Sequence, residues 1–86
     1  MNIKNRAMKI YLKSVAPLEA YSFVDRCRLP SPERECVCAM IEGKNAFAGC
    51  DYIAARYNIH ITYWQYVRKL KRGLEILQKS ANYLSK

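Results

Sequence analysis

Apolar residues recur every three to four positions along most of this chain, and that spacing is typical of amphipathic helices. A first clear helix is predicted over residues 17–27, since Pro17 fits the first turn of a helix. A second helix is predicted after the break at residues 29–30, with Ser31 as its N-cap and Pro32 at its first position. Gly43 marks the end of that helix.

A third helix is predicted to begin near Asn45 or Ala46 and to end at Asn58, a residue that tolerates the left-handed backbone of a helix C-terminus. Its apolar stripe recurs at helical spacing. The expected members of the stripe are Phe47, Cys50, Ile53 or Ala54, and Tyr57.

The last helix is predicted to be long. It is expected to begin after a cap at His60 or Thr62, to continue through Leu77 and to reach as far as Leu84. Gly73 is a weak point, which costs about 1 kcal/mol relative to alanine in a helix interior. The short turn before this helix favours a helix-turn-helix. The predicted fold is therefore all-α, a small helical bundle containing a helix-turn-helix and a long C-terminal helix.

The chain is short enough to form one small domain of 86 residues and 10.0 kDa. Residues 17–86 are expected to form the helix-turn-helix domain with its C-terminal helix extension. Residues 1–16 are expected to form an N-terminal arm, for which the pattern leaves both an extended and a helical conformation open.

Charge is unevenly distributed along the chain, whose formal net charge is +8. Residues 1–16 contribute +4, residues 17–55 contribute −2 and residues 56–86 contribute +6. This asymmetry favours an anionic partner such as nucleic acid, although excess positive charge also serves solubility alone. No stretch approaches the roughly 20 apolar residues of a membrane span, and lysines interrupt any secretory signal. We therefore expect a cytoplasmic protein that does not bind membranes.

One face of the final helix has the composition of a DNA-reading surface. A helical wheel places Tyr63, Val67, Leu70, Leu74 and Leu77 in its apolar arc. The opposite face carries an amide, a hydroxyl and cations, which suit base edges and phosphates, and no acidic residue occurs between Asn58 and Lys71. The predicted DNA-binding residues are Thr62, Gln65, Arg68, Lys69 and Arg72, with phosphate contacts from Arg56 and Lys71. The alternative is an ordinary solvated face of a bundle helix.

The apolar residues of this helix also continue as a heptad seam that reaches Leu84. The part after Gly73 is where a contact between two protomers is expected, at Leu77 and Leu84. Dimers that read DNA place two recognition helices about 34 Å apart on successive grooves. The other possibility is that this seam packs on the chain's own helices.

Catalytic and metal-binding chemistry have little support in the sequence. The closest pair of the four cysteines is Cys36 and Cys38, which point to different sides of a helix, and His60 has no partner at ligand spacing. We therefore interpret the cysteines as reduced and mostly buried, and expect neither a metal nor a cofactor. The chain also lacks a nucleophile set, paired carboxylates and a glycine-rich phosphate loop, so no enzyme is expected.

Three segments together resemble the PapB-type regulators of adhesin (fimbrial) biosynthesis. They are residues 39–57, with Ala39-Met40 and Arg56-Tyr57 at its ends, the pair Tyr63-Trp64, and the basic run 68–72. Leu18-Glu19 and Phe23 match upstream, and the resemblance covers about residues 15–78. The sequence departs from this pattern in its short N-terminus, its cysteine-rich helix and residues 60–62.

The resemblance implies a cytoplasmic transcription regulator that binds duplex DNA as a homo-oligomer and controls adhesin operons. It also implies AT-rich repeated sites approached partly through the minor groove, whereas the second helix of a helix-turn-helix enters the major groove. A weaker resemblance, over residues 29–35, 53–54 and 59, is to the LuxR and sigma region 4 helix-turn-helix, where the spacing from Gly43 to Ile53 is too long. A different class of function remains open, namely a small interaction module that docks on an acidic protein or on RNA polymerase.

Overall fold

The computed structural model describes the backbone of residues 3–84 and the side chains of residues 4–81. This part of the chain contains helices and no strand. The helices are α1 (Ile3–Ser14), α2 (Pro17–Cys27), α3 (Glu33–Ile41), α4 (Ala46–Tyr57) and α5 (Tyr63–Leu84). The predicted all-α class and the long C-terminal helix are thereby confirmed.

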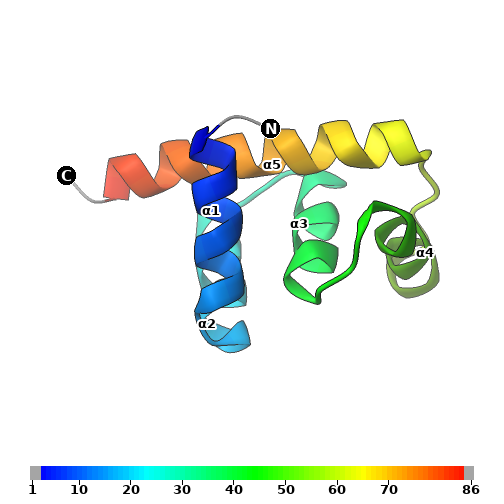
Figure 1. Cartoon of the computed structure of the whole chain (residues 1–86), viewed down its shortest axis with the longest axis horizontal. Coiled ribbons are helices and arrows are strands. Elements are labelled where there is room, and N and C mark those ends of the chain that lie inside the picture. Colours follow the sequence, from blue (N-terminus) through cyan, green and yellow to red (C-terminus); the bar gives the residue numbers. More distant parts are fainter. Residues whose placement is uncertain (1–2, 85–86) are drawn as a thin grey trace.

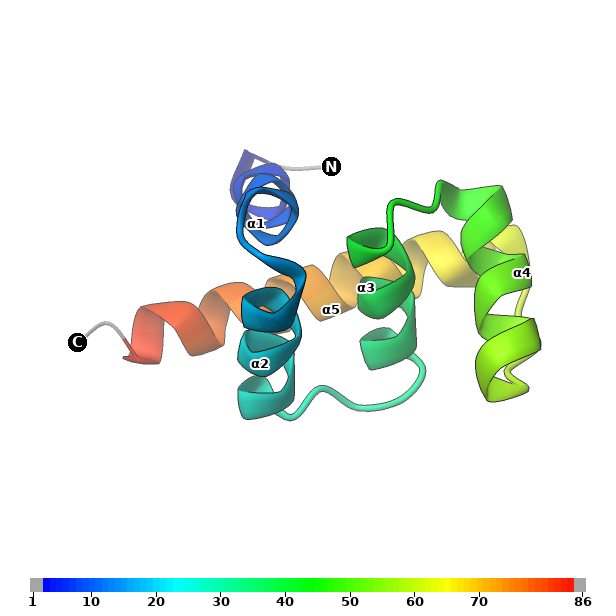
Figure 2. The same ribbon diagram turned by 90° about the horizontal axis from the view of Figure 1, so that it is seen from below.

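The long helix α5 runs along one edge of the molecule, and the other helices pack against it (Figure 1). The helices α1, α2 and α3 run across α5, and α4 lies near its N-terminal end (Figures 1 and 2). In the view of Figure 2, α1 and α2 lie on opposite sides of the C-terminal half of α5. Because α2, α3 and α4 all lie on one side of α5 in Figure 1, the opposite side of α5 is left open.

The central helix of the bundle is α3. Every residue from Cys36 to Met40 is buried, so this helix has apolar neighbours on all sides. One apolar cluster joins α3 to α1, α2 and the C-terminal half of α5, through Val37 and Met40. A second cluster joins α3 to α4 and the N-terminal half of α5, through Cys36 and Ala39. The two halves of α5 are therefore fixed on one buried helix.

The N-terminal segment is part of the core rather than an arm outside it. Residues 3–14 form a helix, the second of the two conformations that the sequence leaves open. Met8 and Leu12 on its inner face are buried in the first cluster. The cations Lys4, Arg6 and Lys13 are exposed on its outer side. The division at residue 16 therefore separates two elements that share one core.

The ends of α4 follow the predicted caps, and the start of α3 does not. The side chain of Asn45 accepts a hydrogen bond from the backbone N–H of Ala48 at 2.9 Å, and Asn58 adopts the left-handed backbone with φ of 55°. By contrast, Ser31 makes no cap for α3, because its hydroxyl donates to the carboxylate of Glu35 instead. The helix therefore starts at Glu33, one residue later than expected.

Gly73 allows α5 to lie close to α3. A Cβ atom at this position would lie 2.8 Å from Cγ2 of Val37 and 3.3 Å from the carbonyl oxygen of Glu33. Since Val37 is fully buried and β-branched, its methyl group has little room to move. The glycine that the sequence marks as a weak point in the helix is thus a point of close approach between two helices.

We expect Gly73→Ala to destabilise the protein, although helix propensity alone predicts a gain of about 1 kcal/mol. The added methyl group would overpack the α3–α5 contact at a cost of about 1–3 kcal/mol. Urea unfolding followed by circular dichroism measures the change. An alanine variant more stable than the parent would contradict the packing described for Gly73.

All four cysteines lie in the described part of the chain and are free. Cys36 and Cys38 are buried in α3, whereas Cys27 and Cys50 are half-buried. Burial raises the pKa of the Cys36 thiol from 9.0 to about 12, because it disfavours the thiolate. The pKa of the Cys38 thiol is also raised, again mainly by burial.

These thiols link stability to pH. The folded protein holds the Cys36 proton more tightly than the unfolded chain does, so the protonated thiol contributes to the free energy of unfolding. This contribution is complete below pH 9 and is lost as the pH rises toward about 12. We expect the free energy of unfolding to fall from about pH 8 to about pH 10.5, and to fall less steeply in Cys36→Ala. Equal slopes in the two proteins, measured by urea unfolding, would count against a buried neutral thiol.

Candidate nucleic-acid interface

The orientation of α5 is set by the residues it buries. Tyr66, Leu74 and Leu77 are buried, and the hydroxyl of Tyr66 donates a hydrogen bond of 3.3 Å to the backbone carbonyl of Cys36 in α3. Val67, expected in the apolar arc, is 37% exposed. The buried face is therefore rotated relative to the predicted one, because the large ring of Tyr66 fills the space beside α3.

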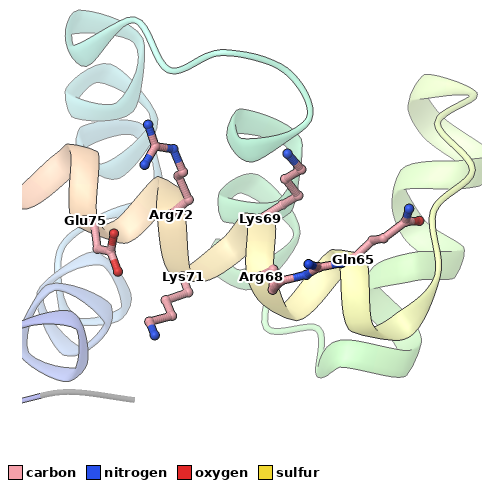
Figure 3. A pocket seen from close by; sticks show the side chains of 6 residues that line it. All are labelled: Gln65, Arg68, Lys69, Lys71, Arg72 and Glu75. Carbon is pink, nitrogen blue, oxygen red and sulfur yellow. The ribbon is translucent and has the colours of Figure 1, made fainter.

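The opposite side of α5 carries the cationic face, which we define as the exposed residues Arg68, Lys71 and Arg72. These residues line a shallow surface depression (Figure 3). In Figure 3, Arg72 and Lys69 point to one side of α5 and Lys71 points to the other, so that positive charge flanks the helix on both sides. The complete lining is Gln65, Arg68, Lys69, Lys71, Arg72 and Glu75.

Few carboxylates oppose these cations. The ion pairs found among the described side chains join Arg34 to Asp25 at 2.7 Å and to Glu35 at 3.7 Å, away from this face. Within the lining of the depression, Glu75 is the one acidic residue against four basic ones. The positive charge of the cationic face is therefore available to a mobile anion or to a phosphate backbone.

Thr62 and Gln65 form a reciprocal cap at the first turn of α5. The backbone N–H of Gln65 donates to the Thr62 hydroxyl at 3.1 Å, and the backbone N–H of Thr62 donates to Oε1 of Gln65 at 2.9 Å. This is the capping box that a Thr-x-x-Gln pattern encodes. Both predicted DNA-binding side chains are thus exposed but already have a structural role. The Nε2 amino group of Gln65 has no partner among the described residues.

Two other predicted site residues lie outside the cationic face. Lys69 is half-buried at the edge of the depression, on the side of α3, and its charge acts on the Cys36 thiol. Arg56 lies on α4, with its guanidinium carbon 6.0 Å from the ring centre of Tyr52 and 5.8 Å from that of Tyr57. The structure therefore brings Lys69 near Arg68 and Arg72 and leaves Arg56 on a separate aromatic surface.

The expected dimer contact is not available at Leu77. This side chain is fully buried in the core of its own chain, where it packs with residues of α1 and α2. The seam after Gly73 is therefore occupied by the chain's own helices, the second possibility that its sequence leaves open. Leu84, the other predicted contact, has a side chain outside the described ones.

An exposed aromatic group adjoins the cationic face, and the sequence interpretation does not include it. Phe47 of α4 lies against Tyr63, with ring centres 4.6 Å apart, and Tyr63 lies 5.0 Å from Trp64. Phe47 is 71% exposed and Trp64 is 72% exposed. The wheel of α5 places Trp64 beside Arg68, which is the signal that could have identified it. The expectation that Phe47 belongs to the buried stripe of α4 is wrong.

Among the described residues, no group of three or more histidine, cysteine, aspartate or glutamate side chains is placed to hold a metal ion. None of the described helices has the length and apolar character needed to cross a membrane.

We expect Thr62→Ala to lower the free energy of unfolding by about 1 kcal/mol, because the variant leaves a backbone N–H of the first turn without its acceptor. Thr62→Ser keeps the hydroxyl and serves as the control, with a stability close to that of the parent. Thermal and urea unfolding measure both changes. A Thr62→Ala variant as stable as the parent would remove the structural role given to this cap.

Comparison with known proteins adds no assignment to this surface. No family model, curated protein or solved structure matches the chain. What the protein does must therefore follow from the geometry and the charge of its own residues, above all those of α5.

Proposed function

We propose that this protein is a DNA-binding transcription regulator that docks on duplex DNA through the cationic face of α5. The observation that carries the proposal is the set of exposed cations Arg68, Lys71 and Arg72 on one helix, none of them in an ion pair with a described residue. Phosphates attract such a face without regard to sequence, and arginine side chains can also read guanine edges.

The arrangement of α4 and α5 supports this proposal. Residues 58–62 join the two helices by a short turn, and α3 packs under both of them, which is the arrangement expected of a helix-turn-helix. In that motif the second helix of the pair enters a groove and its N-terminal residues meet the bases. The capping box holds that N-terminal turn in a defined conformation.

The finer parts of the proposal rest on the resemblance to PapB-type regulators. They are action in the cytoplasm, assembly as a homo-oligomer on DNA and control of adhesin operons. Since Leu77 is buried, the proposed assembly has to use another surface. We propose no catalytic activity and no cofactor.

A second candidate function is docking on an acidic protein. The exposed rings of Phe47 and Trp64 beside the cationic face favour it, because aromatic residues and arginine are enriched at protein interfaces. It predicts a defined complex with a protein and no retention of duplex DNA at moderate salt.

We expect Arg68→Ala and Arg72→Ala each to weaken duplex binding by roughly tenfold, because each variant loses a hydrogen bond between charged groups. Each should also reduce the slope of log affinity against log salt by about 0.9. Fluorescence anisotropy with a labelled duplex, from the region upstream of the protein's own gene, measures both effects over a salt series.

Arg26→Ala is the matched control, since Arg26 is exposed on α2, away from the cationic face. It should leave affinity and salt slope near the parent values, and circular dichroism should give the same helicity for all variants. Unchanged binding in both α5 variants would overturn the proposal, and so would equal losses in Arg26→Ala and Arg68→Ala.

A further inference from the structure

Three aromatic side chains form an exposed cluster where α4 and α5 meet. The aromatic cluster consists of Phe47, from the first turn of α4, and Tyr63 and Trp64, from the first turn of α5. The ring centres of Phe47 and Tyr63 are 4.6 Å apart, and Tyr63 and Trp64 form a T-shaped pair with ring centres 5.0 Å apart and an interplanar angle of 89°. The three rings therefore form one connected apolar surface.

Folding does not account for this surface. The core below it is filled by Tyr66 and Ile53, both buried, so Phe47 and Trp64 are not needed to close it. Two large rings that are both more than 70% exposed forgo the free energy that their burial would supply. Adjacent exposed apolar rings of this kind mark an interaction surface.

The charges next to the aromatic cluster restrict what can bind there. Trp64 precedes Arg68 by one helical turn and Lys71 by two, so all three lie along one line of α5. A second copy that docked ring to ring would bring its own cations against these, at an electrostatic cost. The ligand that satisfies both features is a polyanion that carries flat apolar rings of its own.

We propose that the aromatic cluster stacks unpaired nucleobases, so that the preferred ligand is DNA whose strands are locally separated. This inference rests on the proposed function, in which the cationic face holds the phosphates. In an intact duplex the faces of the bases are covered by their neighbours and only the edges are accessible. The exposed indole ring of Trp64 gains most from a base that has left the stack.

The test uses the intrinsic fluorescence of Trp64, which is the one tryptophan of the chain. The full-length protein is titrated with three probes of one sequence: a paired duplex, the same duplex with a short central bubble of unpaired thymines, and the single strand. We expect the bubble duplex to bind about fivefold or more tightly than the paired duplex. We also expect the bubble to quench the tryptophan fluorescence on binding.

Trp64→Ala should remove the preference for the bubble, measured by anisotropy, while its affinity for the paired duplex stays within about twofold of the parent. Trp64→Phe should keep most of the preference, because the phenyl ring still stacks. Leu18→Ala is the matched control, since Leu18 is an exposed apolar residue on α2, and it should leave the preference unchanged.

Two results would overturn the stacking role and leave the proposed function in place. One is equal affinity of the parent for the paired and the bubble duplex, with no quenching. The other is a fall in molecular mass in Trp64→Ala, measured by sedimentation, which would assign the aromatic cluster to a contact between copies. A parent protein that binds none of the three probes would overturn the proposed function and the stacking role together.

Discussion

The contact between α5 and the buried helix α3 decides what this protein presents to its surroundings. Gly73 lets the two helices approach, and about two helical turns away the Tyr66 hydroxyl donates to the Cys36 carbonyl. These two points fix the rotation of α5 about its axis. Since α3 contributes buried residues to both apolar clusters, α5 cannot turn without opening both of them. The face that carries Arg68, Lys71 and Arg72 is thereby held outward.

The same contact explains why the charge on this face is concentrated. A face that points away from α2, α3 and α4 is also distant from most of the acidic residues, which belong to residues 17–55. By contrast, Arg34 lies within that acidic part of the chain, and its charge is paired with Asp25 and Glu35. The separation of charge along the sequence thus becomes a separation of charge in space, and the open side of α5 is attractive to a polyanion.

The spacing of apolar residues and the capping residues were enough to predict the helices from residue 17 onward, including the caps at Asn45 and Asn58. They could not decide whether residues 1–16 are extended or helical. The apolar face of α1, with Met8 and Leu12, is buried by contacts with residues remote in sequence, such as Leu74 and Leu77 of α5. The wheel identified Arg68 and Arg72 as outward residues, but it also placed the half-buried Lys69 there and put Val67 in the apolar arc. Tyr66 is buried instead of Val67, because periodicity does not tell which side chain fits the space beside a neighbouring helix. Leu77 and Phe47 were misplaced for the same reason: their exposure depends on helices remote in sequence.

Nuclear magnetic resonance can show whether the outward side of α5 is where the protein meets DNA. The side-chain signals of Arg68 and Arg72 would be followed during titration with a duplex. We expect these signals to shift together, while the amide signals of the buried residues of α3 and of the exposed residues of α2 stay in place. Shifts confined to α1 and α2, with the arginine signals of α5 unmoved, would contradict this expectation.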